Sequence, residues 1–217
     1  MTRTTFSRKD LGAIEEAVRE VEARSPGEVV PYAVDRSDGY PEAAWVAATL
    51  GGLVGGLAAG SVYAALGGWI DAPSLWIAAG PAAGAAAGYL LAMLWPALRV
   101  HLTHAAVVER RVHQRALAAF VEQEVFRTRE RTGMLIFLSL LEHRVIVMAD
   151  TGISARVPQH EWDGIVTAIV GGIRQGQPGP ALAAAIRRCG DLLADHGFRR
   201  RRGDRDELSD ELRHRPE

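Results

Sequence analysis

The chain has 217 residues, the size of one ordinary domain or of a small domain with an appendage. It is 48% hydrophobic and 24% charged, so neither whole-chain disorder nor a wholly membrane-buried protein fits. The formal charge of -1 gives no reason to expect a nucleic-acid partner. The single cysteine, Cys189, excludes an intramolecular disulfide framework and a multi-cysteine zinc site. Its place on the apolar side of a helix favours a core residue over a reactive thiol.

The first predicted elements are a helix and a short strand. Ser7 precedes apolar residues at helical spacing, and this run ends near Pro26 and Gly27. Residues 28–35 then resemble a strand, in which Pro31 favours an edge strand or a local break. A polar loop is expected to follow it.

Two segments without a charged side chain come next, residues 43–70 and 74–98. At the average composition these 53 residues should carry roughly 13 charges, yet they contain no Asp, Glu, Lys or Arg. As helices they would be about 42 and 37 Å long, enough to cross a hydrocarbon core of about 30 Å. We therefore expect a transmembrane helical hairpin. The alternative, a buried hairpin in a soluble core, is disfavoured because the rest of the chain has too few apolar residues to cover it.

Three further features of the hairpin agree with this expectation. A polar turn with a proline, at residues 71–73, separates the two segments. Amphipathic rings that prefer the headgroup layer lie near the four segment ends: Trp45, Trp69, Trp76 and Trp95. Glycines spaced by four would let helix backbones approach closely, within the hairpin or in a homo-oligomer: Gly51, Gly52, Gly55, Gly56, Gly60, Gly80, Gly84 and Gly88.

The orientation follows from basic residues near the ends of the hairpin. The turn has no Lys or Arg, whereas arginines flank the hairpin at positions 24, 36, 99, 110, 111 and 115. The positive-inside rule places both flanks, and so both termini, in the cytoplasm. We expect a two-span protein of the cell inner membrane.

The remaining 119 residues complete a second, soluble part. Residues 100–131 have the pattern of one long amphipathic helix, and residues 134–141 and 144–149 that of a β-hairpin. Residues 161–173 and 180–193 follow as helices, and a charged tail from 198 is expected to be disordered. The order predicts an α/β/α sandwich with a small mixed sheet, interrupted by the hairpin. The expected parts are 1–42, 43–98, 99–197 and 198–217.

The soluble parts resemble a TPM domain over residues 7–35 and 100–196. The resemblance is carried by residues 25–30 (SPGEVV) and, more specifically, by residues 132–153 (TGMLIFLSLLEHRVIVMADTGI). The two inserted spans resemble a bacterial, membrane-anchored subgroup of uncharacterised proteins. The resemblance implies an acid phosphatase, a calcium-binding protein, or a factor in assembly or repair of membrane complexes. The family's usual Asp-Asn-Gly-like turn is Arg131-Thr132-Gly133 here, so the acidic metal ligand that the resemblance implies at this turn is absent.

Two sets of side chains are candidate metal ligands. Asp150 closes the last strand of the β-hairpin and, with Asp35 and Asp38, could form an oxygen cluster for Ca²⁺ or Mg²⁺. The alternative is that Asp150 caps a turn or helix. His101 and His104, three apart on the expected helix, could share a metal, or could be polar residues at the membrane interface.

The leading functional hypothesis is a non-enzymatic, membrane-anchored cytoplasmic domain. Its partners would be the lipid bilayer and a membrane protein, in complex assembly or quality control. The alternative is a metal-dependent, acid-type phosphatase that uses Asp150 with Asp35 or Asp38. An oligomeric channel is a third hypothesis, although the spans offer no polar lining.

Overall fold

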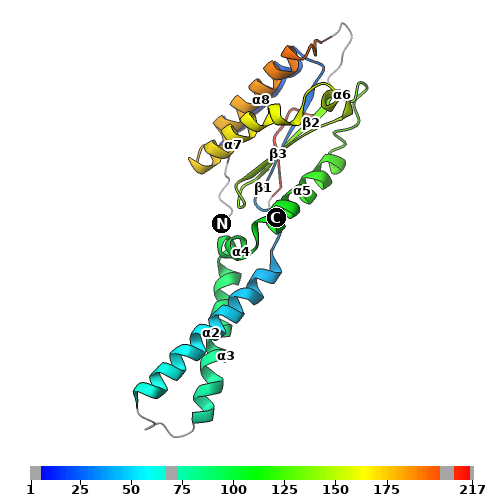
Figure 1. The fold of residues 1–217 in the computed structure, drawn as a ribbon. Helices are drawn as coiled ribbons and strands as arrows, with labels where there is room; N and C mark the ends of the chain where they lie inside the picture. Colours follow the sequence, from blue (N-terminus) through cyan, green and yellow to red (C-terminus); the bar gives the residue numbers. More distant parts are fainter. Residues whose placement is uncertain (1–5, 67–72, 201–207, 216–217) are drawn as a thin grey trace. The chain divides into compact units, whose positions relative to one another are not determined.

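The computed structural model describes residues 6–66, 73–200 and 208–215, and its helices and strands are labelled in Figure 1. The chain divides into two compact units, which we call the α/β unit (Met1–Ser37 with Arg111–Glu217) and the helical unit (Asp38–Arg110). The elements are α1 Arg8–Glu22, β1 Glu28–Val34, α2 Pro41–Ala65, α3 Pro73–Leu94, α4 Pro96–Leu102, α5 Ala105–Glu122, β2 Gly133–Ser139, β3 Arg144–Ala149, α6 Thr151–Ser154, the 3₁₀ helix η1 Gln159–Trp162, α7 Asp163–Arg174, α8 Pro178–Asp195 and β4 Arg213–Arg215.

The α/β unit is built on a mixed four-stranded sheet in the order β3-β2-β1-β4. The strand β1 runs parallel to both β2 and β4, whereas β2 and β3 form the predicted antiparallel hairpin. Because side chains alternate along a strand, β1 and β2 present apolar residues to both faces, as their fully buried patterns show. The predicted α/β fold with a small mixed sheet is confirmed.

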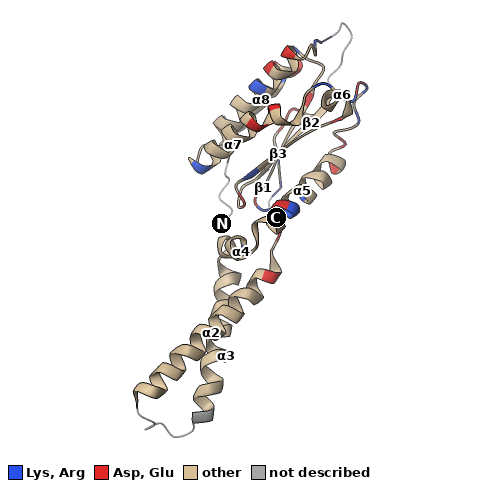
Figure 2. Ribbon diagram, viewed as in Figure 1, with Lys and Arg blue, Asp and Glu red and all other residues tan. Residues whose placement is uncertain are grey.

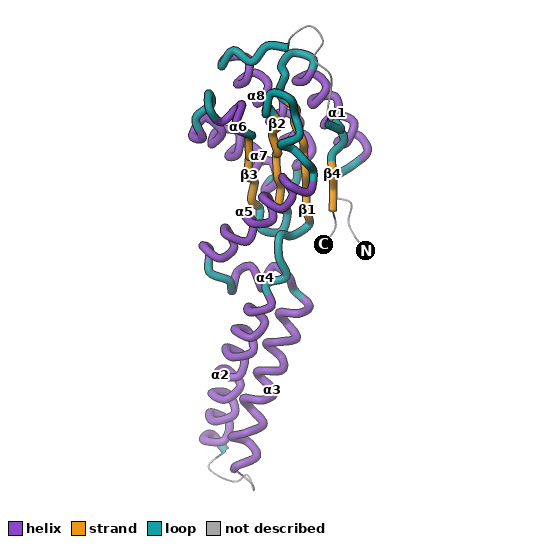
Figure 3. The backbone as a smooth tube through the Cα atoms, turned by 90° about the vertical axis from the view of Figure 1, so that its right-hand side faces the viewer, coloured by secondary structure: helices purple, strands orange, loops and turns teal. Residues whose placement is uncertain are grey.

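Helices cover both faces of this sheet (Figure 3). On one face, Ala33 and Ile136 belong to a core that continues into α1, α7 and α8. On the other face, Tyr32 stacks on Phe137, with 6.0 Å between ring centroids. Arg115 of α5 covers Tyr32 there, because its Nη2 donates to the Tyr32 hydroxyl at 2.9 Å and its guanidinium lies 5.5 Å from the ring centroid. The arrangement is the expected α/β/α sandwich.

The helix α1 begins where the sequence predicts. Ser7 and Asp10 form a reciprocal capping box, which satisfies backbone donors at the start of the helix. The apolar face of α1 packs on α8. A Cβ at Gly190 of α8 would lie only 2.6 Å from Cγ2 of Val21, so this close approach requires glycine. At the rim, the hydrogen bond from Arg187 lowers the pKa of Glu20.

The single long helix predicted for residues 100–131 is wrong. The chain breaks at Thr103, whose backbone is extended and whose Oγ1 donates to the Arg99 carbonyl at 2.8 Å. The new helix α5 then starts with the Ala106 amide donating to His104 Nδ1 at 3.3 Å. It ends at Glu122, before Glu124 with a φ of 52°. The helical unit, residues 38–110, includes α4 and the start of α5, whereas the bounds 43–98 expected for the membrane hairpin itself stay a prediction.

The C-terminal tail is also corrected. Disorder was expected from residue 198, but residues 213–215 form β4 beside the second half of β1. Pairing starts at Tyr32, immediately after Pro31, which lacks the amide hydrogen that a further neighbour could use. The expectation that β1 is an edge strand therefore holds for its first half only. Of the hairpin features, Trp69 and residues 71–72 lie outside the described residues.

Candidate functional site

The helical unit contains two helices, Pro41–Ala65 and Leu75–Leu94, that are long and apolar enough to cross a membrane. Figure 2 shows charge distributed over the α/β unit, whereas α2 and α3 are nearly free of it. The acidic residue in the first turn of α2 is Glu42. Charge is thus confined to the end of the described hairpin at which α2 begins.

The large apolar side chains of these helices point away from the protein. The exposed fractions of Leu57, Ile77 and Leu94 are 73%, 75% and 83%, respectively. Exposing this apolar surface to water costs free energy, whereas contact with lipid tails does not. The soluble-core alternative for this hairpin is not what the packing shows.

The predicted glycine stripe lies mainly between α2 and α3. A Cβ at Gly51 or at Gly84 would overlap the carbonyl group of the other residue, and the same holds for Gly55 with Gly80. A Cβ at Gly88 would likewise overlap the carbonyl of Ala47. The two backbones therefore touch directly, which only glycine permits at these positions.

Three of the predicted glycines play a smaller part or none. A Cβ at Gly52 would lie 3.4 Å from the Pro81 carbonyl, and one at Gly56 would lie 3.3 Å from the Pro81 ring. These distances are close to ordinary van der Waals contact. At Gly60 a Cβ would meet no atom within 4 Å. The stripe therefore joins the hairpin to itself, and a role for it between copies stays a prediction.

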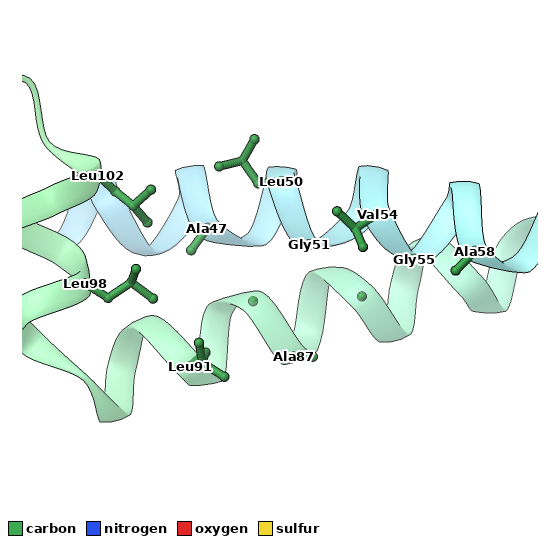
Figure 4. Close-up of a pocket in the computed structure, with 12 residues that line it drawn as sticks. Ala47, Leu50, Gly51, Val54, Gly55, Ala58, Ala87, Leu91, Leu98 and Leu102 are labelled. Atoms are coloured by element: carbon green, nitrogen blue, oxygen red, sulfur yellow. The ribbon is translucent and has the colours of Figure 1, made fainter.

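An apolar groove of about 450 Å³ runs along α2 and α3 (Figure 4). Glycines 51, 55, 84 and 88 form its floor, while larger side chains such as Leu50, Val54 and Leu91 rise around it. Leu98 and Leu102 of α4 line one end, where they pack beside Ala47 and Ala92. The groove follows from the same glycines that let the helices touch.

Arg99 of α4 binds the C-terminal end of α3 and the chain just before α2. Its Nε donates to the Ala92 carbonyl at 2.7 Å, its Nη2 to Met93 at 3.0 Å and its Nη1 to Gly39 at 2.8 Å. The carbonyls at the end of a helix lack intrahelical partners and carry partial negative charge, so a guanidinium is a suitable cap. In the sequence, Arg99 indicates only the membrane topology, and nothing there predicts this role.

The metal site predicted from Asp150, Asp35 and Asp38 is not formed. The β2–β3 hairpin returns Asp150 to the start of the sheet, where its amide donates to the Gly133 carbonyl at 2.9 Å. Asp35 follows the far end of β1, about 20 Å away along the strand. Among the described residues there is no group of three or more His, Cys, Asp or Glu side chains placed to hold a metal. The phosphatase pair of Asp150 with Asp35 is therefore not assembled either.

Each of the three carboxylates has a local partner instead. Asp150 caps α6 by accepting from the Thr151 amide at 2.7 Å, and it forms a 2.9 Å ion pair with Nε of Arg131. Asp35 lies 2.8 Å from Nε2 of His214. Asp38 Oδ1 accepts from the Tyr40 amide at 2.9 Å. The capping alternative for Asp150 is the one that the structure supports.

The two histidines do not share a metal site. His101 Nδ1 lies 2.8 Å from the Ala97 carbonyl within α4, whereas His104 Nδ1 accepts from the Ala106 amide in the first turn of α5. The helix break at Thr103 lies between them, so the three-residue spacing does not put both rings on one helical face. Cys189 is fully buried, and desolvation raises the pKa of its thiol to about 12, as expected of a core residue.

A buried polar cluster at the far end of β1 and β2 was not predicted. Glu142 accepts from the Ser37 amide at 3.0 Å and from the Ser139 hydroxyl. The two serine hydroxyls lie 2.7 Å apart. The cluster ties the turn between β2 and β3 to the chain leaving β1. A single glutamate in a short polar turn gave no signal for this, because one of its partners, Ser37, is more than 100 residues away in sequence.

Comparisons with known proteins support the fold alone. No family model and no curated protein matches the chain. A solved structure that is similar to it is the NMR structure of BA42 protein from the psychrophilic bacterium Bizionia argentinensis. The identity is 18%, the TM-score is 0.61, and the match covers 99% of each chain.

The glycine contact is tested by two alanine substitutions that should affect the melting temperature differently. Gly84→Ala should lower the melting temperature of the full chain in detergent micelles, because the methyl group forces α2 and α3 apart at a cost of about 1–3 kcal/mol. Gly60→Ala should leave it unchanged or raise it, because that position is open and alanine favours the helix. Equal effects of the two substitutions would contradict the direct backbone contact.

The partners of Asp150 give a second test, measured as the free energy of unfolding of the full chain. Asp150→Ala removes both the cap and the ion pair and should cost about 2–3 kcal/mol. Asp150→Asn keeps an oxygen for the Thr151 amide and should cost less. Asp195→Ala, a matched change at the exposed end of α8, should stay within about 0.5 kcal/mol. A loss that Ca²⁺ reverses would contradict the capping role.

Proposed function

We propose that this chain is a membrane-anchored protein whose helical hairpin spans the inner membrane twice and holds the α/β unit in the cytoplasm. The observation that carries the proposal is the outward-facing apolar surface of α2 and α3, with side chains such as Leu57 and Ile77 exposed. The basic residues on both flanks favour a cytoplasmic location for both termini.

The function that we propose for the α/β unit is to bind a protein partner, in assembly or quality control of a membrane complex. One surface supports this. Leu117 and Val121, one helical turn apart on α5, are 43% and 61% exposed, and an exposed apolar pair of this kind suits a protein contact. The resemblance of residues 132–153 to the TPM family, some of whose members act in assembly or repair of membrane complexes, favours the same function.

The membrane anchor is tested by Leu57→Arg. An arginine near the middle of a span costs about 2.5–3.5 kcal/mol, so much of the protein should leave the carbonate-washed membrane fraction. Leu57 points outward, so its substitution leaves the contact between α2 and α3 intact. Leu117→Arg, the same change on α5, should stay in the membrane. Unchanged fractionation of Leu57→Arg would contradict a spanning helix.

The partner-binding surface is tested by affinity capture in mild detergent. The wild-type chain should recover a specific membrane protein, and Leu117→Arg with Val121→Arg should reduce its recovery about ten-fold, because buried apolar contacts dominate such interfaces. Ala194→Arg on the exposed side of α8 is the matched control and should leave recovery unchanged. Repeated recovery of the chain alone would contradict the proposal.

A further inference from the structure

The outer side of β1 is closed by a short segment from the end of the chain, residues 208–215, which we call the C-terminal segment. Its strand β4 pairs with β1 over three residues only, from Tyr32 to Val34. None of its eight residues is buried, whereas every residue of β1 is. The contact is therefore a surface attachment and forms no part of the core.

The segment is attached to both faces of the sheet by alternating side chains. On the face that packs on α1, Leu212 contacts the core, and the His214 and Phe6 rings form a T-shaped pair with 6.1 Å between their centroids. His214 also lies 2.8 Å from Asp35. On the face of α5, Arg213 donates to Gln123 at 2.7 Å.

Charge complementarity runs along the whole edge. Arg215 pairs with Glu122 at 3.5 Å, and upstream Asp210 pairs with Arg19 at 3.1 Å. The amide of Leu208 donates to Glu28 at 3.3 Å. The edge therefore fits an extended chain with an apolar residue followed by basic ones, here Leu212 to Arg215. His214 and Arg215 face carboxylates, whereas Arg213 binds the neutral Gln123 side chain. Exposed ion pairs of this kind contribute little each, so the attachment is reversible.

We propose that this edge of β1 is a docking site for an extended, basic segment of a partner protein, and that the C-terminal segment occupies the site until the partner displaces it. The partner strand would add to β1 in parallel. It would carry the same pattern, an apolar residue followed by basic residues. The proposal deepens the proposed partner-binding function and rests on it, since it names a surface and the chemistry of its ligand.

The test uses the full chain in detergent micelles and a synthetic peptide of residues 208–215 as the probe. A chain shortened by residues 208–217 should bind the peptide one to one, and the intact chain should bind it at least ten-fold more weakly, because its own segment competes. An intact-length chain with Arg213→Glu, His214→Glu and Arg215→Glu should bind like the shortened one, which excludes a folding defect of the truncation. A scrambled peptide should bind to none of them.

The recognition chemistry is tested in the shortened chain. Asp35→Asn should weaken peptide binding about five-fold, whereas Asp195→Asn, the same change away from the edge, should not. Equal binding to the intact and shortened chains, or no effect of Asp35→Asn, would overturn the proposal. Concentration-dependent dimers of the intact chain that the shortened chain does not form would also overturn it, in favour of exchange between copies. Failure of the peptide with successful capture of a partner through α5 would reject this site and leave the proposed function standing.

Discussion

Direct contact between the backbones of α2 and α3 is the interaction on which the helical unit depends. Beyond Glu42 in its first turn, this hairpin has no charged side chain among the described residues, so ion pairs cannot hold its length together. In lipid, burial of apolar surface would not hold it together either. Close packing remains, and Gly51 against Gly84 and Gly55 against Gly80 provide it. The same absence of side chains opens the groove beside Leu50 and Leu91, so tight association and a hollow surface have one cause.

The α/β unit is held together by different physics. Its sheet is buried on both faces, and small residues again set the closest approach, as at Gly190 against Val21. Polar groups at its ends are satisfied across long stretches of sequence, as when Glu142 binds Ser37. One chain thus contains a unit folded around a hydrophobic core and a unit with the apolar surface expected of a protein in lipid.

Much of the architecture could be predicted from periodicity and composition. The absence of charge in residues 43–70 and 74–98 marked the hairpin, and alternating apolar runs marked β2 and β3. The helix break at Thr103 could not be found in this way, because no glycine or proline marks it. The extended Thr103 backbone and the bond from the Ala106 amide to His104 are visible only in the structure. The metal site failed for a topological reason: the β2–β3 hairpin reverses the chain, so adjacency to a strand end did not tell which end of the sheet Asp150 reaches.

The first half of β1 has a consequence for solubility. An exposed strand edge is a template on which further copies can stack into fibres. Here Pro31 removes one backbone donor from that edge, and the Glu22 carboxylate accepts another, the Val29 amide at 3.1 Å. A further strand would therefore find neither of these two backbone donors available on that side of β1. Loss of these donors disfavours the edge-to-edge pairing by which strands of separate molecules stack.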